Sequence, residues 1–187
     1  MKFIQNYKFL FLLLVIVFSC KLYKKDFDNP VDYNANDDLG IRAPALVFYP
    51  KTQTINQNEV IKIESVIVFH PDSLESFAGL HFSVQFPNSL LELDTIKPGL
   101  FITDTSNSTP LFTYNFDGSN QIDIYAYFLS ETKLNIEGTG HIADIIFNPI
   151  STGTDSLYYD LDDCQMIKIN DDEIQIMGKR GAEIIIQ

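Results

Sequence analysis

The chain has 187 residues, so one domain following any leader segment is the natural expectation. Its formal charge of −12 excludes the usual mode of nucleic-acid binding, in which lysine and arginine side chains meet phosphates, and makes an anionic lipid surface an unsuitable partner. Two cysteines cannot form the disulfide framework of a small secreted scaffold, so the core must come from apolar packing.

The N-terminus has the features of a secretory signal over residues 1–19. Two lysines precede an unbroken apolar run at residues 9–18, which is too short to span a bilayer comfortably. Val17, Ser19 and Cys20 then resemble a bacterial lipobox, an aliphatic and a small residue before the cysteine that receives lipid. We therefore expect Cys20 to be lipidated and to anchor the protein in the cell envelope, at the outer membrane, facing the periplasm or the cell surface. The alternative is an ordinary signal peptide followed by a chance cysteine.

Residues 20–43 are rich in Asn, Asp and Lys and show no sustained hydrophobic period. This composition predicts a lipidated cysteine followed by a flexible tether. An extra N-terminal strand, anchored by Tyr33 or Leu39, is the alternative. The domain itself is expected to occupy residues 44–187.

From residue 44 onward the sequence is typical of an all-β sandwich. Short runs of Ile, Val, Phe, Tyr and Thr are separated by Pro, Gly, Asn and Asp, and no helical period lasts beyond two turns. Asp117 and Gly118 suit a hairpin turn between two of these runs. The expected strands are 45–49, 59–69, 78–86, 90–95, 110–116, 121–129, 141–148, 156–161, 165–169 and 182–186.

Alternation within the strands indicates which side chains are buried. Successive strand residues point to opposite faces, so each apolar set marks the core side. The two clearest inward sets are Leu80, Phe82, Val84 and Phe86 in one strand, and Ile122, Ile124, Ala126 and Phe128 in another. Their polar and tyrosine neighbours must therefore point outward.

Several motifs occur in an order that resembles cohesin domains over about residues 45–187. An alternating strand ends at Phe86 and Pro87, a Leu-Glu-Leu strand follows at 91–93, and Pro98-Gly99 closes it; a later strand begins after a glycine, at 138–147. The resemblance implies a nine-stranded β-sandwich with jelly-roll topology, a fold shared with several carbohydrate-binding modules. It also implies binding of dockerins, which are calcium-loaded modules attached to polysaccharide-degrading enzymes.

The cohesin strand order would bring strands 78–86, 110–116, 121–129 and 156–161 into one sheet. Gly79 and His81 stand where cohesins commonly have Asn and Asp on the outward face, so that dockerin-binding pair is not carried over. The outward row that we predict as the partner-binding surface, for protein or glycan, consists of His81, Ser83, Gln85, Asp123, Tyr125, Tyr127 and Tyr158. Tyrosine suits interfaces, although it also simply favours strands.

No catalytic or metal-binding arrangement is visible in the sequence. His70, His81 and His141 show no metal-ligand spacing, and no serine lies in a nucleophile-elbow motif. Cys164 has no nearby histidine and is expected to be a packed, inert thiol. The acidic runs at 160–163 and 170–172 are the best candidates for binding a cation, but they match no EF-hand loop. We interpret them as acidic turns, and a calcium site is the alternative. We therefore predict no enzyme activity, no catalytic residue, no metal and no cofactor.

Two functions remain open from the sequence. The first is a membrane-anchored extracytoplasmic module that mediates protein–protein interaction, with a dockerin-type or other partner, in polysaccharide-related envelope assemblies. The second is a carbohydrate-binding lipoprotein that captures glycans at the cell surface; the absence of Trp, the strongest sugar-stacking side chain, counts against it. A purely structural role in an envelope complex is a third hypothesis.

Overall fold

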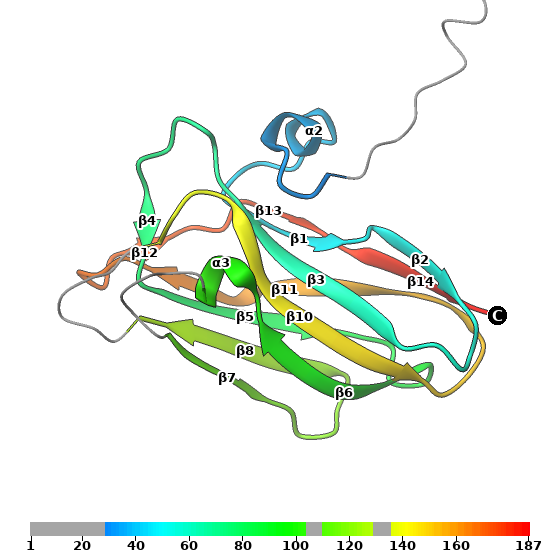
Figure 1. Cartoon of the computed structure of the whole chain (residues 1–187). Coiled ribbons are helices and arrows are strands. Elements are labelled where there is room, and N and C mark those ends of the chain that lie inside the picture. Colours follow the sequence, from blue (N-terminus) through cyan, green and yellow to red (C-terminus); the bar gives the residue numbers. More distant parts are fainter. Residues whose placement is uncertain (1–28, 104–109, 129–135) are drawn as a thin grey trace, which may run out of the picture.

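Two β-sheets pack face to face in the computed structural model, which describes residues 29–103, 110–128 and 136–187 (Figure 1). The predicted signal peptide and Cys20 lie outside the described residues. Within those residues, no helix has both the length and the apolar character needed to cross a bilayer.

The described secondary structure is almost entirely strand. The strands are β1 (Ala45–Tyr49), β2 (Thr52–Ile55), β3 (Ile61–Val68), β4 (Ser76–Phe77), β5 (Gly79–Gln85), β6 (Leu91–Pro98), β7 (Leu111–Asn115), β8 (Gln121–Tyr127), β9 (Ile136–Glu137), β10 (Gly140–Pro149), β11 (Gly153–Ile167), β12 (Glu173–Ile174), β13 (Gly178–Arg180) and β14 (Ala182–Ile186). The helices are α2 (Tyr33–Asp38) and α3 (Leu100–Thr103). The predicted all-β class is confirmed, and nine described strands, β1, β3, β5, β6, β7, β8, β10, β11 and β14, have five or more residues.

The two sheets are connected along one side, where each sheet contains one parallel pair of strands. The five-stranded sheet has the order β13-β1-β3-β10-β6, and the seven-stranded sheet has the order β2-β14-β11-β5-β8-β7 with β12 added to β11. β1 runs parallel to β13 in the first sheet, whereas β2 runs parallel to β14 in the second. The chain therefore passes from one sheet to the other between β1 and β2 and again between β13 and β14, and these segments close this side of the sandwich. β4 and β9 form a separate two-stranded ribbon.

Several strand predictions need correction. The stretches 156–161 and 165–169 belong to one strand, β11, because residues between Asp160 and Gln165 bulge out of the ladder instead of forming a turn. The two-residue strands β4, β9 and β12 were not predicted, and neither were β2 and β13. Both are short, and each pairs in parallel with a strand far along the chain, so no hairpin signal accompanies them.

The predicted inward residues of β5 and β8 form the middle of the core. Leu80, Phe82, Val84, Ile122 and Ile124 are fully buried. Their partners come from β3, β10 and β11, and together these strands place one continuous apolar layer between the sheets. Burial of each such side chain contributes about 1.5–3 kcal/mol.

Residues 29–43 are packed on the domain, which corrects the predicted boundary at residue 44. Tyr33 and Ile41 cover a second apolar cluster on the outer face of the five-stranded sheet, made of Ala45, Val47, Val66 and Val68. α2 begins after Asp32, whose side chain accepts a hydrogen bond from the Ala35 amide at 3.2 Å. β1 and the end of β3 are apolar on both faces, so their outer face needs this cover. The segment forms a helix, and the alternative of an extra strand is not observed.

Asn36 fastens this segment, and its loss should destabilise the fold. The side chain is 1% exposed, and Nδ2 donates to the carbonyl oxygens of Pro30 at 3.0 Å and Asp32 at 2.8 Å. We expect Asn36→Ala to lower the free energy of unfolding by about 1–3 kcal/mol, since buried acceptors lose their donors. Urea denaturation of the full-length chain measures this, with the exposed Asp38→Ala as control. Equal midpoints for the two variants would restore the tether interpretation.

Candidate functional site

The outer face of the seven-stranded sheet brings most of the predicted site residues into adjacent rows. In the register of β5 and β8, His81 lies opposite Tyr125 and Gln85 lies opposite Gln121. β11 flanks β5 on the other side and places Tyr158 beside Gln85. The prediction that these four strands, β11, β5, β8 and β7, share one sheet is therefore confirmed. We call this surface the outer face of the β5–β8 sheet.

Aromatic rings occupy the centre of the outer face. The rings of His81 and Tyr125 stack with their centroids 4.4 Å apart and their planes within 5°. The ring of Tyr127 lies over Gly79, where a Cβ atom would collide with it and with Ile167. The Tyr127 ring occupies the space that a side chain at position 79 would need. This explains on physical grounds why the residue at this position is glycine. Burial raises the pKa of Tyr125, and the charge of Asp123 adds to the effect, so its phenol stays protonated at neutral pH.

A polar network lies beside the rings. Asp123 Oδ1 is 3.3 Å from His81 Nε2 and accepts a hydrogen bond from Gln121 Nε2 at 3.4 Å. Gln85 Nε2 in turn donates to Gln121 Oε1 at 2.7 Å. Gln121 also reaches Asp163 Oδ2, at 3.4 Å, which links the network to the β11 bulge. The network holds these side chains in fixed positions on the surface.

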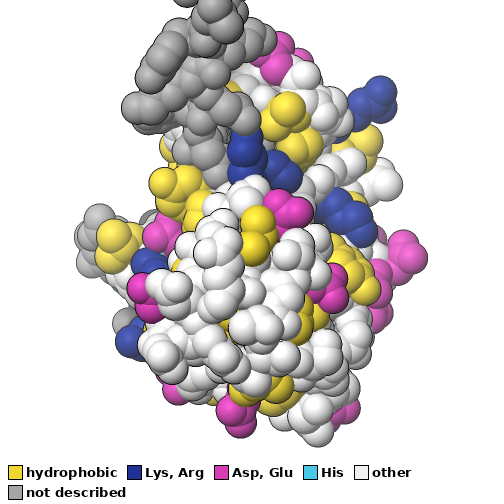
Figure 2. Space-filling model, turned by 90° about the vertical axis from the view of Figure 1, so that its right-hand side faces the viewer, with side chains coloured by type: hydrophobic (Ala, Val, Ile, Leu, Met, Phe, Trp, Pro, Cys, Tyr) yellow, Lys and Arg dark blue, Asp and Glu magenta, His cyan; other side chains and the backbone are white. Residues whose placement is uncertain are grey.

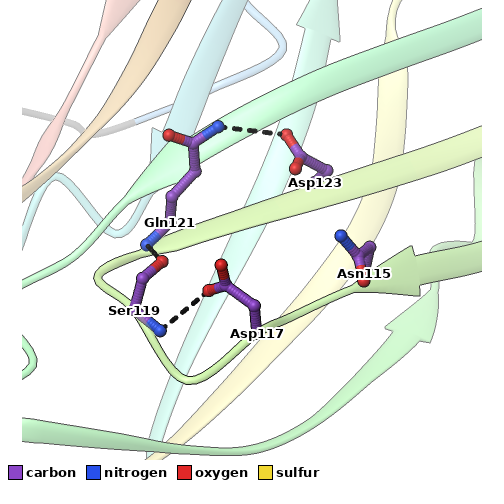
Figure 3. A pocket seen from close by; sticks show the side chains of 5 residues that line it. All are labelled: Asn115, Asp117, Ser119, Gln121 and Asp123. Atoms are coloured by element: carbon purple, nitrogen blue, oxygen red, sulfur yellow. Dashed lines mark hydrogen bonds between the residues drawn. The ribbon is translucent and has the colours of Figure 1, made fainter.

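A polar hollow of about 180 Å³ lies where the β7–β8 hairpin turns. Figure 3 shows its five lining side chains, Asn115, Asp117, Ser119, Gln121 and Asp123. Asp117 Oδ1 accepts from the Ser119 amide at 2.9 Å, and Gly118 has φ 88°, as the predicted turn requires. The sequence analysis did not assign Asn115, Asp117 or Gln121 to the site, although alternation from Asp123 through the turn would have placed them there.

Ser83 was predicted to belong to the partner-binding surface, and this prediction needs correction. It points away from the core but is fully buried, because the β11 bulge covers it and Cys164 Sγ lies 3.5 Å from its amide nitrogen. A partner cannot reach it. Tyr158, by contrast, is 49% exposed, while His81, Gln85, Asp123, Tyr125 and Tyr127 are partly exposed.

The Cys164 thiol and the acidic runs participate in local structure. Burial raises the pKa of Cys164 to about 11, and Sγ donates to the Asp160 carbonyl at 3.0 Å, so the thiol stays protonated. Asn170 Nδ2 donates to Asp172 Oδ2 at 2.7 Å within a turn. Among the described residues, no three His, Cys, Asp or Glu side chains converge as metal ligands would.

A second, larger hollow opens at the end of the sandwich. It has a volume of about 400 Å³ and is lined by Phe86, Asn88, Leu91, Glu92, Leu93, Phe116, Gly118, Ser119 and Ile150. Figure 2 views the molecule along the length of the sandwich and shows apolar side chains scattered among polar and charged ones. That view therefore presents no broad apolar patch.

The fold has counterparts among solved structures. No protein-family model matches the sequence, and no curated protein matches it either. One match is a chain in the crystal structure of a CaDoc0917–CaCohA2 complex, and CaCohA2 is a protein of Clostridium acetobutylicum. That chain superposes on this one with a TM-score of 0.64 at 17% identity, over 76% of this chain and 99% of that one. The seventh ScaB type I cohesin of Pseudobacteroides cellulosolvens gives 0.60 at 18% identity, over 76% and 91%. This chain has the cohesin fold.

A third match with the cohesin fold comes from a type I cohesin–dockerin complex of Clostridium thermocellum. It contains the OlpA cohesin and gives a TM-score of 0.59 at 14% identity, over 76% of this chain and 99% of that one. The described domain thus spans nearly the whole length of these cohesin-fold chains. At such identities the likeness establishes the fold, and the surface of this chain must be interpreted from its own residues.

Proposed function

We propose that this protein is a membrane-anchored, extracytoplasmic protein-binding module, cohesin-like, which holds partners in polysaccharide-related envelope assemblies without catalysing a reaction. The observation that carries the proposal is the outer face of the β5–β8 sheet, where Tyr125 lies in the interior of the face, Tyr127 lies at the end of β8, and hydrogen-bonded polar groups lie beside them. Buried aromatic centres with a polar surround are typical of protein interfaces. The cohesin fold supports the same function, because several matching structures are complexes with dockerins.

The ring geometry favours a protein over a glycan. Sugars pack their C–H faces on aromatic rings that lie flat and open. His81 and Tyr125 are cross-strand neighbours that stack on each other, so their planes stand upright on the sheet and each offers its edge to solvent. Tyr127 covers Gly79 with its ring. The upright rings of His81 and Tyr125, between hydrogen-bonding side chains, suit an interdigitating protein surface.

An affinity experiment with the full-length chain tests the choice between these two partners. The detergent-solubilised chain is used as bait in the envelope fraction of the same cells, with and without an excess of the polysaccharides that the cells degrade. We expect a discrete protein to be retained at equal yield in both samples. Retention that the polysaccharide abolishes, or retention of polysaccharide alone, would favour the glycan-binding alternative.

The membrane anchor is a separate part of the proposal. Val17, Ser19 and Cys20 support lipidation at Cys20, which would tether the domain through buried acyl chains, each CH₂ contributing about 0.8 kcal/mol. Intact mass of the membrane-extracted protein should correspond to residues 20–187 plus acyl groups. Cys20→Ala should move the protein into the soluble fraction, and Cys164→Ala, the matched control, should not. A mature form that begins elsewhere with a free thiol would contradict the anchor.

A further inference from the structure

Charge is divided unequally between the two sheets. The strands of the five-stranded sheet hold four acidic residues, Glu64, Glu92, Asp94 and Asp144, and four basic ones, Lys62, Lys97, Lys179 and Arg180. The seven-stranded sheet holds seven acidic residues, Asp123, Asp155, Asp160, Asp162, Asp163, Glu173 and Glu183, and its described strands contain no Lys or Arg. The seven-stranded sheet is therefore the acidic one, and it carries the proposed docking surface, the outer face of the β5–β8 sheet.

The acidic groups on the outer face of the β5–β8 sheet accept hydrogen bonds from neighbouring polar groups, and Asp123 also lies 3.3 Å from His81 Nε2. Asp123 and Asp163 both accept from the Gln121 amide, and Asp117 accepts from the Ser119 backbone N–H. Hydrogen bonding by the Ser119 side chain, and then by its backbone N–H, lowers the pKa of Asp117. These carboxylates lie along one end of the face, next to the β7–β8 turn. The opposite end is apolar, since Leu111 is 50% exposed beside Tyr127 in the adjoining row. The face thus has an acidic end and an apolar end, with the stacked rings of His81 and Tyr125 between them.

From this arrangement we infer that the partner is a basic protein surface, whose Lys or Arg side chains meet Asp117, Asp123 and Asp163 while an apolar side chain packs against Leu111 and Tyr127. The inference rests on the proposed docking function of this face. An acidic or neutral partner would desolvate the three carboxylates without compensation, which disfavours binding. A basic partner would also be steered toward this sheet, because its seven acidic residues outnumber the one lysine, Lys179 of β13, that reaches it through the Tyr159 carbonyl.

Two synthetic helical peptides test the inference against the detergent-solubilised full-length chain. Both have one leucine-rich face, and the polar face carries Lys and Arg in one peptide and Glu in the other. We expect fluorescence anisotropy to show binding of the basic peptide only, with an affinity that falls as salt rises. The triple variant D117N/D123N/D163N should weaken that binding about tenfold, as three partly exposed ion pairs would. The control E64Q/E92Q/D94N removes the same charge from the five-stranded sheet and should leave the affinity nearly unchanged.

The outcomes separate this inference from the function on which it rests. Equal weakening by the two triple variants, equal binding of the two peptides, or no binding of the basic peptide would each overturn the basic partner. If the Y125A/Y127A variant loses the envelope protein while D117N/D123N/D163N retains it, the docking face stands and the partner is not basic. If the envelope protein binds Y125A/Y127A as well as the parent chain, the docking function itself fails.

Discussion

Replacing both Tyr125 and Tyr127 with alanine is expected to weaken partner binding by about 30-fold to 1,000-fold. Central aromatic residues of an interface typically cost about 2 kcal/mol or more on truncation, and a loss of 2–4 kcal/mol corresponds to that range. Tyr125 lies in the interior of the outer face and stacks on His81, and Tyr127 lies at the end of β8 and covers Gly79. Isothermal titration with the partner obtained from the envelope measures the change.

The double variant should remain folded, because the two rings do not contribute to the core. Their strand neighbours Ile124 and Ala126 supply the buried side chains of β8 and are unchanged. The matched control is Tyr114→Ala, which removes a partly exposed tyrosine of β7 that faces the other side of the sheet. It should leave the affinity within about twofold of the parent value, in the range of a substitution outside the contact. An affinity of the double variant equal to that of the control would place the site in the loops.

Tyr159→Ala is expected to lower the free energy of unfolding by about 3–5 kcal/mol, as loss of a large buried aromatic side chain does. The ring is fully buried between the sheets and stacks on Phe48 with centroids 4.0 Å apart. Its hydroxyl is 2.8 Å from Ser65 Oγ, which is also buried. Tyr159→Phe keeps the ring but leaves the Ser65 hydroxyl without this partner, so it should cost only about 1 kcal/mol. Equal costs for the two variants would show that the hydroxyl pair outweighs the ring.

Alkaline pH should destabilise the fold through the same region. Burial raises the pKa of Tyr159 well above its usual value, and burial raises the pKa of Cys164 to about 11. Both groups lose their protons more readily in the unfolded chain, so their contribution to stability is complete below about pH 8.5 and falls as pH rises toward and beyond 11. Urea midpoints measured from pH 8 to 11 should decline, and the decline should be shallower in Tyr159→Phe. A flat profile would contradict the assigned burial.

The strands of the core were predictable because alternation has a strict physical cause. Leu80, Phe82 and Val84 could not face solvent without the loss of several kcal/mol of apolar burial, so the register of β5 followed from the sequence. The same alternation placed His81, Tyr125 and Tyr127 outward. Which strands lie side by side, however, depends on contacts between distant residues, and that prediction came from the resemblance to cohesins.

Other features could not be predicted because they depend on neighbours distant in the sequence. The bulge in β11 inserts residues that read as an acidic turn, and only the pairing with β5 shows that it covers Ser83. The polar composition of α2 suggested a tether, whereas its Tyr33 packs on an apolar outer face formed by β1 and β3. The role of Gly79 could not be predicted either, because only the structure places the ring of Tyr127 over it.

The claim that partners dock on the outer face of the β5–β8 sheet is tested most directly by site-specific photo-crosslinking in intact cells. A photoreactive amino acid is placed singly at Gln85 or Tyr127 on that face, and at Lys62 or Asp94 on the five-stranded sheet as controls. We predict one crosslinked protein product from the two outer-face positions and none from the two control positions. Crosslinks from Lys62 or Asp94 alone would contradict the account.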